Sequence, residues 1–272
     1  MPVRHNPQPL FRDLFTPEAV AARGGRPAAG MFLSSGDPTT AEICAGAGLD
    51  YLLIDAEHAP LTLQDVLAQL RTIAGYRVPT LVRVPALDTV AIKQFLDLGA
   101  QTLLVPMVDD AAMARRAVAA ARYPDGSAEG GVRGVGSALA RSGRWNRIPG
   151  YLPGAADHVS VIVQIETAAG VRNADEIAAV HGIDGVFIGP SDLAADMGFP
   201  GQLDHPLVQR AIRAAIRVIC ASGKAAGVLW TDEANARRAL ADGASFLATA
   251  IDVTTYAAAI RDAATRGLAL KA

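Results

Sequence analysis

Short apolar and β-branched runs alternate along the chain with longer alanine-rich stretches whose apolar positions recur at helical spacing. This alternation predicts strands separated by helices, as in a parallel sheet built from βα units. Eight such runs are present, at 28–33, 51–54, 80–84, 102–105, 161–165, 186–188, 226–229 and 246–250. Eight βα units predict an α/β fold, a (β/α)8 TIM barrel in which residues 1–272 form one domain. A doubly wound sheet usually uses fewer strands.

Helix boundaries follow the same rhythm. A proline, two threonines and a glutamate within residues 38–42 form a helix start signal. Glycines stand just before five of the predicted strands, at positions 48, 99, 182, 223 and 243. Glycine readily adopts the left-handed conformation that ends many helices. We therefore expect each of these glycines to end a helix before the chain enters the next strand.

Two segments fall outside the repeat. Residues 1–25 are predicted to form an N-terminal extension and a first helix. Residues 123–158 are rich in Gly, Arg and Pro and separate the fourth and fifth predicted strands by far more than one helix. Long irregular connections in compact domains are usually functional or mobile. We predict that this second segment lies near the active-site mouth of the barrel.

Composition narrows the possible partners and compartments. A net charge of -2 and an isoelectric point near 6.2 offer no basic field for nucleic acid, so none is expected as a partner. Cys44 and Cys220 lie in alanine-rich helical patterns and predict free thiols in a reducing compartment, the cytoplasm. Residues 1–9 contain three prolines and do not resemble a signal peptide. No apolar run approaches the roughly 20 residues that cross a bilayer, so no membrane partner is expected.

Two carboxylates that each end an apolar run are the strongest chemical signal in the chain. Glu166 follows VIVQI at 161–165, and Asp192 follows VFIGPS at 186–191. A carboxylate at the end of a buried strand is costly to desolvate unless a positive group meets it. Two of them in successive strand regions suggest a shared divalent cation, Mg²⁺ or Mn²⁺. Structural salt bridges or helix caps are the alternative.

Other polar side chains follow the ends of neighbouring strands. Asp55, Glu57 and His58 follow the second predicted strand, and Arg83 lies at the end of the third. In a barrel these positions converge on the face that carries the active site. A 2-oxo acid bound to the cation would develop enolate charge that an arginine stabilises, and histidine is suited to move a proton near neutral pH. A structural His58, and an Arg83 that only pairs with Asp55 or Glu57, are the alternatives.

Longer stretches carry a family resemblance. They are LLIDAEHAP at 52–60, IKQ at 92–94, VPMV at 105–108, RGVGSALAR at 133–141, WNRIP at 145–149, VQIET at 163–167 and GVFIGPSDL at 185–193. In these stretches the chain resembles the HpcH/HpaI aldolase family, the metal-dependent (class II) pyruvate aldolases. The family includes 4-hydroxy-2-oxoheptanedioate aldolase and 2-dehydro-3-deoxyglucarate aldolase. The resemblance extends over about residues 30–255.

The resemblance implies a role for each matching position. Glu166 and Asp192 would be the metal ligands, with Mg²⁺, Mn²⁺ or Co²⁺ as the cofactor. His58 would be the base, acting through a water, and Arg83 would bind substrate and stabilise the pyruvate enolate. The remaining matches are Asp97, as the acidic partner of the histidine, and the substrate-binding positions Asp55, Gln164, Ser191 and Leu229.

The resemblance also implies an assembly. Members are expected to form a homohexamer, a trimer of dimers, in which the C-terminal helix is exchanged between subunits and Asp97 serves a neighbouring site. Two positions depart from the family pattern. Ser191 stands where alanine is common, at a position whose role is mostly through the backbone. Trp230 stands where smaller aliphatic residues are common, and we hypothesise that its ring reshapes the aldehyde end of the substrate site.

We therefore predict an aldehyde-lyase, a carbon–carbon lyase that reversibly cleaves 4-hydroxy-2-oxo acids to pyruvate and an aldehyde through a metal-bound pyruvate enolate. The expected substrates are of the 4-hydroxy-2-oxoheptanedioate or 2-dehydro-3-deoxyglucarate type. A Schiff-base mechanism is disfavoured because Lys93 lies in a helix pattern and Lys224 precedes the seventh strand. Two alternatives stay open: an acyl-CoA ester lyase of the citrate lyase β subunit type, and a non-catalytic sugar-acid binding barrel.

Overall fold

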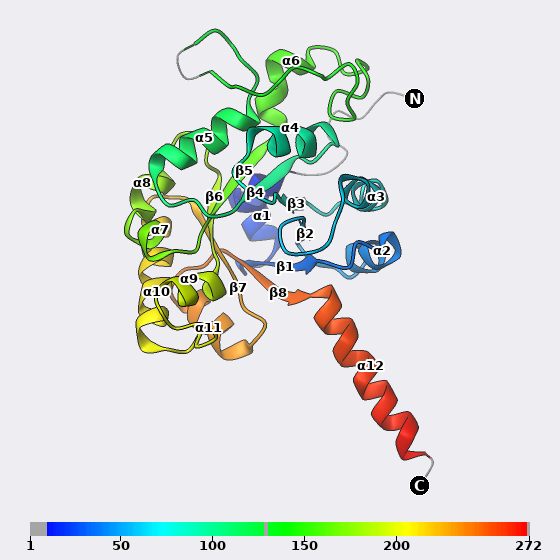
Figure 1. Ribbon diagram of the computed structural model, residues 1–272, viewed down its shortest axis with the longest axis vertical. Coiled ribbons are helices and arrows are strands. Elements are labelled where there is room, and N and C mark those ends of the chain that lie inside the picture. The colour runs from blue at the N-terminus through cyan, green and yellow to red at the C-terminus, as the bar shows by residue number, and fades with distance from the viewer. Residues whose placement is uncertain (1–9, 128–129, 271–272) are drawn as a thin grey trace.

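Eight parallel strands form a closed barrel in the computed structural model, which describes residues 10–127 and 130–270 (Figure 1). The strands pair in chain order, and β8 closes the barrel against β1. They are β1 Ala28–Leu33, β2 Tyr51–Asp55, β3 Thr80–Arg83, β4 Thr102–Val105, β5 Ser160–Ile165, β6 Gly185–Ile188, β7 Ala225–Leu229 and β8 Phe246–Ile251. The predicted TIM barrel is confirmed, and each predicted strand agrees with an observed one to within one residue at either end.

Helices connect the strands and surround the barrel. The connecting helices are α2 Pro38–Ala45, α3 Leu63–Ile73, α4 Thr89–Asp97, α5 Ala111–Ala121, α7 Ala168–Arg172, α8 Ala174–Ala179, α9 Pro190–Asp196, α10 Pro206–Ala221 and α11 Glu233–Ala241. A 3-10 helix η1 Phe11–Phe15 and α1 Pro17–Ala22 precede β1, α6 Tyr151–Gly154 and η2 Ala155–His158 precede β5, and α12 Asp252–Ala269 follows β8. The glycines at 48, 99, 182, 223 and 243 all have positive φ, so their predicted role at helix ends is confirmed.

The strands separate two apolar layers because their side chains alternate between the inside and the outside of the barrel. Every strand contributes to an inner cluster that includes Tyr51, Phe187 and Phe246. Phe11 of η1 packs edge-on against Tyr51 and Phe246, the first residues of β2 and β8, at centroid distances of 5.3 and 5.0 Å. Its ring therefore closes the N-terminal end of the barrel. The alternate residues of the strands, such as Leu52, point outward and pack against the helices in an outer cluster.

Within one chain, the long segment 123–158 lies at the N-terminal end of the barrel, away from the active-site mouth of its own barrel. Ser142 N donates to the carbonyl of Asp97 at 3.3 Å, and the Arg141 guanidinium donates to the carbonyl of Leu98 at 3.2 Å. Both carbonyls lie at the C-terminal end of α4. The segment joins a helix to the following strand, and such connections lie opposite the face formed by the strand C-termini. Figure 1 shows α6 at one end of the molecule and α12 at the other.

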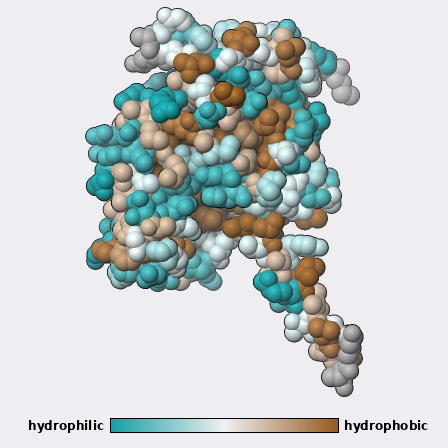
Figure 2. Space-filling model, in the orientation of Figure 1, coloured by the Kyte–Doolittle hydropathy of each residue, from teal (hydrophilic) through white to brown (hydrophobic). Residues whose placement is uncertain are grey.

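The C-terminal helix α12 extends away from the barrel (Figure 1). Hydrophobic patches recur along it (Figure 2). Val253, Tyr256, Ile260 and Leu268 are all exposed there. Among the described residues, no helix has the length and apolar character needed to cross a membrane. The first nine residues of the predicted N-terminal extension lie outside the described part, which shows η1 and α1 in the rest of that extension.

Candidate active site

A cavity of about 780 Å³ opens at the C-terminal end of the barrel. Side chains from strand ends form its floor, and the first turn of α9 and the start of α12 form part of its rim. Asp55, Arg83 and Leu229 are the last residues of their strands, and Gln164 is the last but one of β5. Its lining includes Asp55, His58, Arg83, Gln164, Ser191, Asp192 and Leu229, all of which the sequence analysis had placed at the site.

Arg83 is held at the cavity floor by two carboxylates. Its Nε and Nη2 donate to the two oxygens of Asp55 at 2.9 and 2.8 Å, and the guanidinium and that carboxylate are both buried. Its Nη1 lies 3.0 Å from Glu57 Oε2, and its Cζ lies 5.0 Å from the Phe32 ring centroid. The pairing that the sequence left as an alternative is therefore present, with both acids. Each terminal nitrogen carries a second N–H, which could meet a substrate oxygen.

Asp55 also shapes the loop that carries the candidate base. Its Oδ1 accepts the main-chain N–H groups of Glu57 and His58 at 3.1 and 3.3 Å. His58 is exposed at the cavity mouth, and its Nε2 lies 3.9 Å from Glu57 Oε2. Burial raises the pKa of the Glu57 carboxyl above its ordinary value. The sequence placed Glu57 at this face of the barrel but gave it no role beyond a possible ion pair with Arg83, and that pair is present.

Glu166 follows β5 directly and is buried beneath the cavity lining. Its Oε1 accepts the main-chain N–H of Met107 at 2.9 Å, and its Oε2 accepts a hydrogen bond from Gln164 Nε2. Burial, together with the nearby charges of Glu57 and Asp192, raises the pKa of this carboxyl to about 7 despite the two hydrogen bonds, which lower it. Among the described residues, no lysine, arginine or histidine forms an ion pair with Glu166. Glu166 therefore lacks the salt bridge of the structural alternative, and it is not a helix cap either, since Thr167 is the N-cap of α7.

The residues around Glu166 fit a divalent cation. Asp192 lies in the first turn of α9, faces the cavity, and is close enough to Glu166 for their charges to repel. Gln164 Oε1 is buried without a hydrogen-bond partner. In the described part of the chain, no group of three or more His, Cys, Asp or Glu side chains is arranged to hold a metal. A cation held by Glu166 and Asp192 would therefore complete its shell with water or substrate oxygens, as Mg²⁺ commonly does.

Gly189 makes room for this carboxylate. A Cβ at position 189 would lie 2.5 Å from Glu166 Oε2 and 3.1 Å from Gln164 Nε2. Gly189→Ala is expected to displace Glu166 and weaken Mn²⁺ binding by about tenfold or more. Isothermal titration of metal-stripped protein would measure this change. Gly154→Ala, where a Cβ at the end of α6 would meet no atom within 4 Å, is the matched control. Equal Mn²⁺ affinity in the two variants would contradict this account of Gly189.

The raised pKa of Glu166 predicts a pH-dependent stability of the metal-free protein. The folded state holds the proton up to about pH 7, whereas the ordinary value is 4.5. This contribution to stability is therefore fully present below the ordinary value and is lost as pH rises through 7. The melting temperature of wild type minus that of Glu166→Gln is expected to fall between about pH 5 and about pH 8. Calorimetry in chelator would measure it, and a constant difference would contradict the pKa.

Two predicted site residues lie away from the cavity. Trp230 directly follows the inward-facing Leu229, so its side chain points to the outside of the barrel. There it is buried in the outer cluster between strands and helices. Its ring therefore does not line the cavity, contrary to the hypothesis that it reshapes the aldehyde end. Asp97 ends α4 at the opposite end of the barrel, where its Oδ1 lies 2.6 Å from Arg133 Nη2. It does not meet His58 within one chain.

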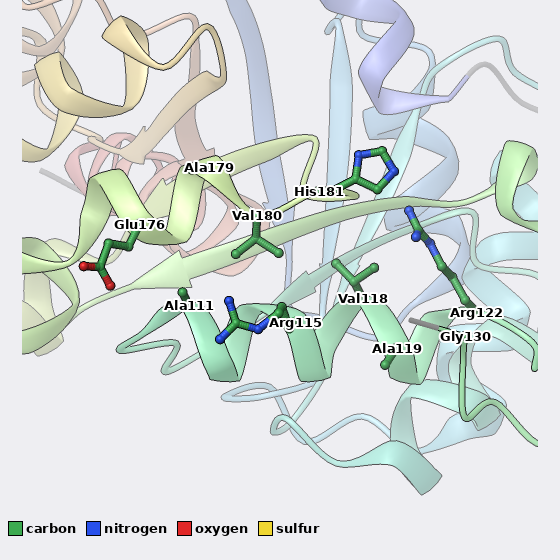
Figure 3. A pocket seen from close by; sticks show the side chains of 10 residues that line it. All are labelled: Ala111, Arg115, Val118, Ala119, Arg122, Gly130, Glu176, Ala179, Val180 and His181. Atoms are coloured by element: carbon green, nitrogen blue, oxygen red, sulfur yellow. The ribbon is translucent and has the colours of Figure 1, made fainter. Parts of the chain in front are cut away.

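Another pocket, of about 650 Å³, lies outside the barrel between α5 and α8 (Figure 3). Arg122 and His181 stand at one end of it and Glu176 at the other. Its lining comes from the two helices and the loops that follow them, with no residue from the C-terminal end of a strand. The candidate catalytic side chains that the sequence predicted lie at the barrel mouth and not in this outer groove.

Comparisons with known proteins show which proteins this chain is similar to. The profile of the family described as HpcH/HpaI aldolase/citrate lyase matches residues 28–259. The chain is 53% identical to a hydroxypyruvate/pyruvate aldolase of Deinococcus radiodurans over 94% of this chain and 91% of that protein. It is 55% identical to a 4-hydroxy-2-oxo-heptane-1,7-dioate aldolase of Salmonella dublin over 87% of this chain and 89% of that protein. A crystal structure of a family protein from Burkholderia cenocepacia J2315 superposes with a TM-score of 0.84 at 38% identity, covering 89% of this chain and 94% of that one.

Proposed function

The chain belongs to the HpcH/HpaI aldolase/citrate lyase family, and we propose that it is a divalent-metal-dependent aldolase that reversibly cleaves 4-hydroxy-2-oxo acids to pyruvate and an aldehyde. The observation that carries this proposal is the convergence of four side chains at the barrel mouth: Arg83, Asp192 and the exposed His58 line one cavity, and the buried Glu166 lies close to Asp192. The relatives that are more than half identical to this chain are aldolases, which favours C–C cleavage over the acyl-CoA lyase alternative.

Each side chain has a distinct task in this proposal. Glu166 and Asp192 hold the cation, Mg²⁺, Mn²⁺ or Co²⁺, which when bound supplies a Lewis acid at the keto oxygen of the substrate. Arg83, oriented by Asp55 and Glu57, offers its remaining N–H groups to the enolate oxygen that develops during cleavage. His58 removes the proton of the C4 hydroxyl, through a water, and returns a proton in the synthesis direction.

Binding of the pyruvate half follows from the same lining. Gln164 Nε2 is used by Glu166, which leaves the buried Gln164 Oε1 as an acceptor toward the cavity. Ser191 lies at the start of α9, where main-chain N–H groups at a helix N-terminus can receive a substrate carboxylate. Leu229 supplies an apolar wall, being the last inward-facing residue of β7. These three positions are proposed to bind substrate rather than to move protons.

Exchange of pyruvate methyl hydrogens in D₂O tests the proposal. Metal-stripped protein would be followed by proton NMR before and after addition of Mg²⁺, Mn²⁺ or Co²⁺. Metal-dependent loss of the methyl signal is expected, because the enolate forms from pyruvate alone. No exchange with any of the metals would overturn the proposal. Cleavage of malyl-CoA without action on free hydroxy-oxo acids would then favour the acyl-CoA lyase, and pyruvate binding without turnover would favour a binding protein.

A homohexamer with exchanged α12 helices is part of the proposal, as is a cytoplasmic location. The apolar residues of α12 support the exchange, since Val253, Tyr256 and Ile260 are spaced to lie on one face of the helix and are exposed in the single chain. Asp97 supports it too, because that side chain lies too far along the barrel to meet His58 of its own subunit. A neighbouring copy could bring the two together.

Ile260→Glu is expected to dissociate the assembly, since it places a charge in the apolar face of α12. Light scattering after size exclusion would measure a lower molar mass than for wild type. Asp262→Lys changes the charge two residues on, toward the opposite face, and is expected to keep the wild-type mass. Equal masses for the two variants would contradict burial of the Ile260 face. Asp252 should stay intact in such designs, because its oxygens accept the N–H groups of Ser34 and Ser35 at 2.8 and 3.1 Å.

A further inference from the structure

Met107 adopts a backbone conformation that residues with a Cβ rarely occupy. It follows β4 and Pro106 and has a φ of 55°. In the left-handed region the Cβ approaches the carbonyl oxygen closely, so only glycine and, to a lesser degree, asparagine and aspartate visit it routinely. The other described non-glycine residues with positive φ are Arg144, Trp145 and Asn146, in the segment at the opposite end of the barrel. Met107 alone among these four stands beside the candidate active site.

The unusual conformation gives the Met107 peptide a specific partner. Its N–H donates to Glu166 Oε1 at 2.9 Å, across a separation of 59 residues. The next residue, Val108, donates its N–H to the carbonyl of Gln164 at 3.0 Å, which continues the pairing between the β4 and β5 chains. The chain thus turns one N–H toward the carboxylate and then rejoins the ladder. The neighbouring amide of Gln164 holds the other oxygen of Glu166, so both oxygens are fixed.

The side chain of Met107 does not explain this geometry. It is 47% exposed, so its packing contributes little to the core and a shorter side chain would leave no buried void. The contact that depends on the conformation is made by the main chain. Strained backbone that persists beside a cavity commonly serves to orient a functional group.

We propose that Met107 is a positioning residue, whose left-handed backbone orients Glu166 so that the free lone pairs of its carboxylate face a divalent cation. The inference rests on the proposed role of Glu166 as a metal ligand. A carboxylate oxygen has two lone pairs, and each oxygen of Glu166 uses one of them for an N–H donor. Partners that orient a ligand in this way tune metal affinity without touching the metal.

A substitution series at position 107 separates the backbone from the side chain. Met107→Asn and Met107→Gly keep access to the left-handed region, whereas Met107→Ile and Met107→Val disfavour it strongly because their side chains branch at Cβ. Met107→Leu matches isoleucine in volume without that branch, so the difference between these two variants reports backbone preference and not side-chain size. The Mn²⁺ dissociation constant of each metal-stripped, full-length variant would be measured by isothermal titration. Circular dichroism and melting temperature would identify any variant that fails to fold.

The expected order follows backbone preference and not side-chain size. Met107→Ile and Met107→Val are expected to weaken Mn²⁺ binding by about tenfold or more, and the Asn and Gly variants to stay within about threefold of wild type. A fall in melting temperature alone, with unchanged Mn²⁺ affinity in the folded Ile or Val variant, would overturn the inference. Equal weakening in all five variants would overturn it too, in favour of a side-chain role. Absence of Mn²⁺ binding by wild type would overturn the proposed function as well.

Discussion

Glu166→Gln is expected to abolish metal-dependent aldol cleavage and to weaken Mn²⁺ binding by more than about a hundredfold. Loss of a residue that merely orients a metal ligand typically costs about 10-fold to 100-fold in affinity, and loss of the ligand itself should exceed that range. The amide keeps the size of the side chain but removes the negative charge that the cation needs. Isothermal titration with Mn²⁺ and the pyruvate exchange assay would measure the two effects separately.

The outer groove supplies the matched control. Glu176 lies on α8 in the pocket outside the barrel (Figure 3), and Glu176→Gln makes the same chemical change away from the strand ends. It is expected to leave Mn²⁺ affinity and exchange at wild-type values. If Glu166→Gln still bound Mn²⁺ as tightly as Glu176→Gln, the assignment of Glu166 as a metal ligand would be wrong.

Arg83→Lys is expected to lower kcat by about a hundredfold to a thousandfold while Mn²⁺ affinity changes little. Removing one preorganised donor to a developing oxyanion typically has an effect of about this size. An ammonium group is a point charge and cannot bridge Asp55 bidentately while it also contacts Glu57. Steady-state kinetics with a 4-hydroxy-2-oxo acid would measure kcat, and titration would measure the metal.

The control for this variant is the same Arg→Lys change at a surface arginine that also pairs with a carboxylate. Arg237 forms an exposed pair with Glu233 on α11, and Arg237→Lys is expected to retain wild-type kcat. Wild-type kcat in Arg83→Lys would show that the Arg83 pairs serve only the fold. A large loss of Mn²⁺ affinity would instead show that Arg83 acts through the arrangement of Glu166 and Asp192.

Much of the architecture could be predicted because its signals are local. A strand of the barrel needs only a short apolar run, and the following helix needs an amphipathic period and a glycine at its end. These features gave eight strands with nearly correct bounds. The same logic placed Asp55, Arg83 and Glu166 at one face, since in a parallel barrel the residues that end strands meet at the C-terminal face.

Segment 123–158 and Trp230 show that chain topology decides which end or which layer of the barrel a residue occupies. Residues 123–158 follow α5 and precede β5, and such a connection lies at the N-terminal end of a barrel whatever its composition. Trp230 follows the inward-facing Leu229, so strand alternation turns its ring outward. In both cases the order of strands and helices along the chain, and not composition, sets the position within one subunit.

The sequence by itself determined the barrel, its strand bounds and which carboxylates stand at the strand ends, because periodicity and strand termini are properties of neighbouring residues. Only the tertiary structure decided how those groups are held. Arg83 meets Asp55 across 28 residues, and Met107 N meets Glu166 across 59. Such contacts depend on strand register and on single backbone torsions, which no local pattern specifies. The φ of Met107 and the space beside Gly189 are set by the packing of the whole barrel. These two features determine how the Glu166 carboxylate is oriented.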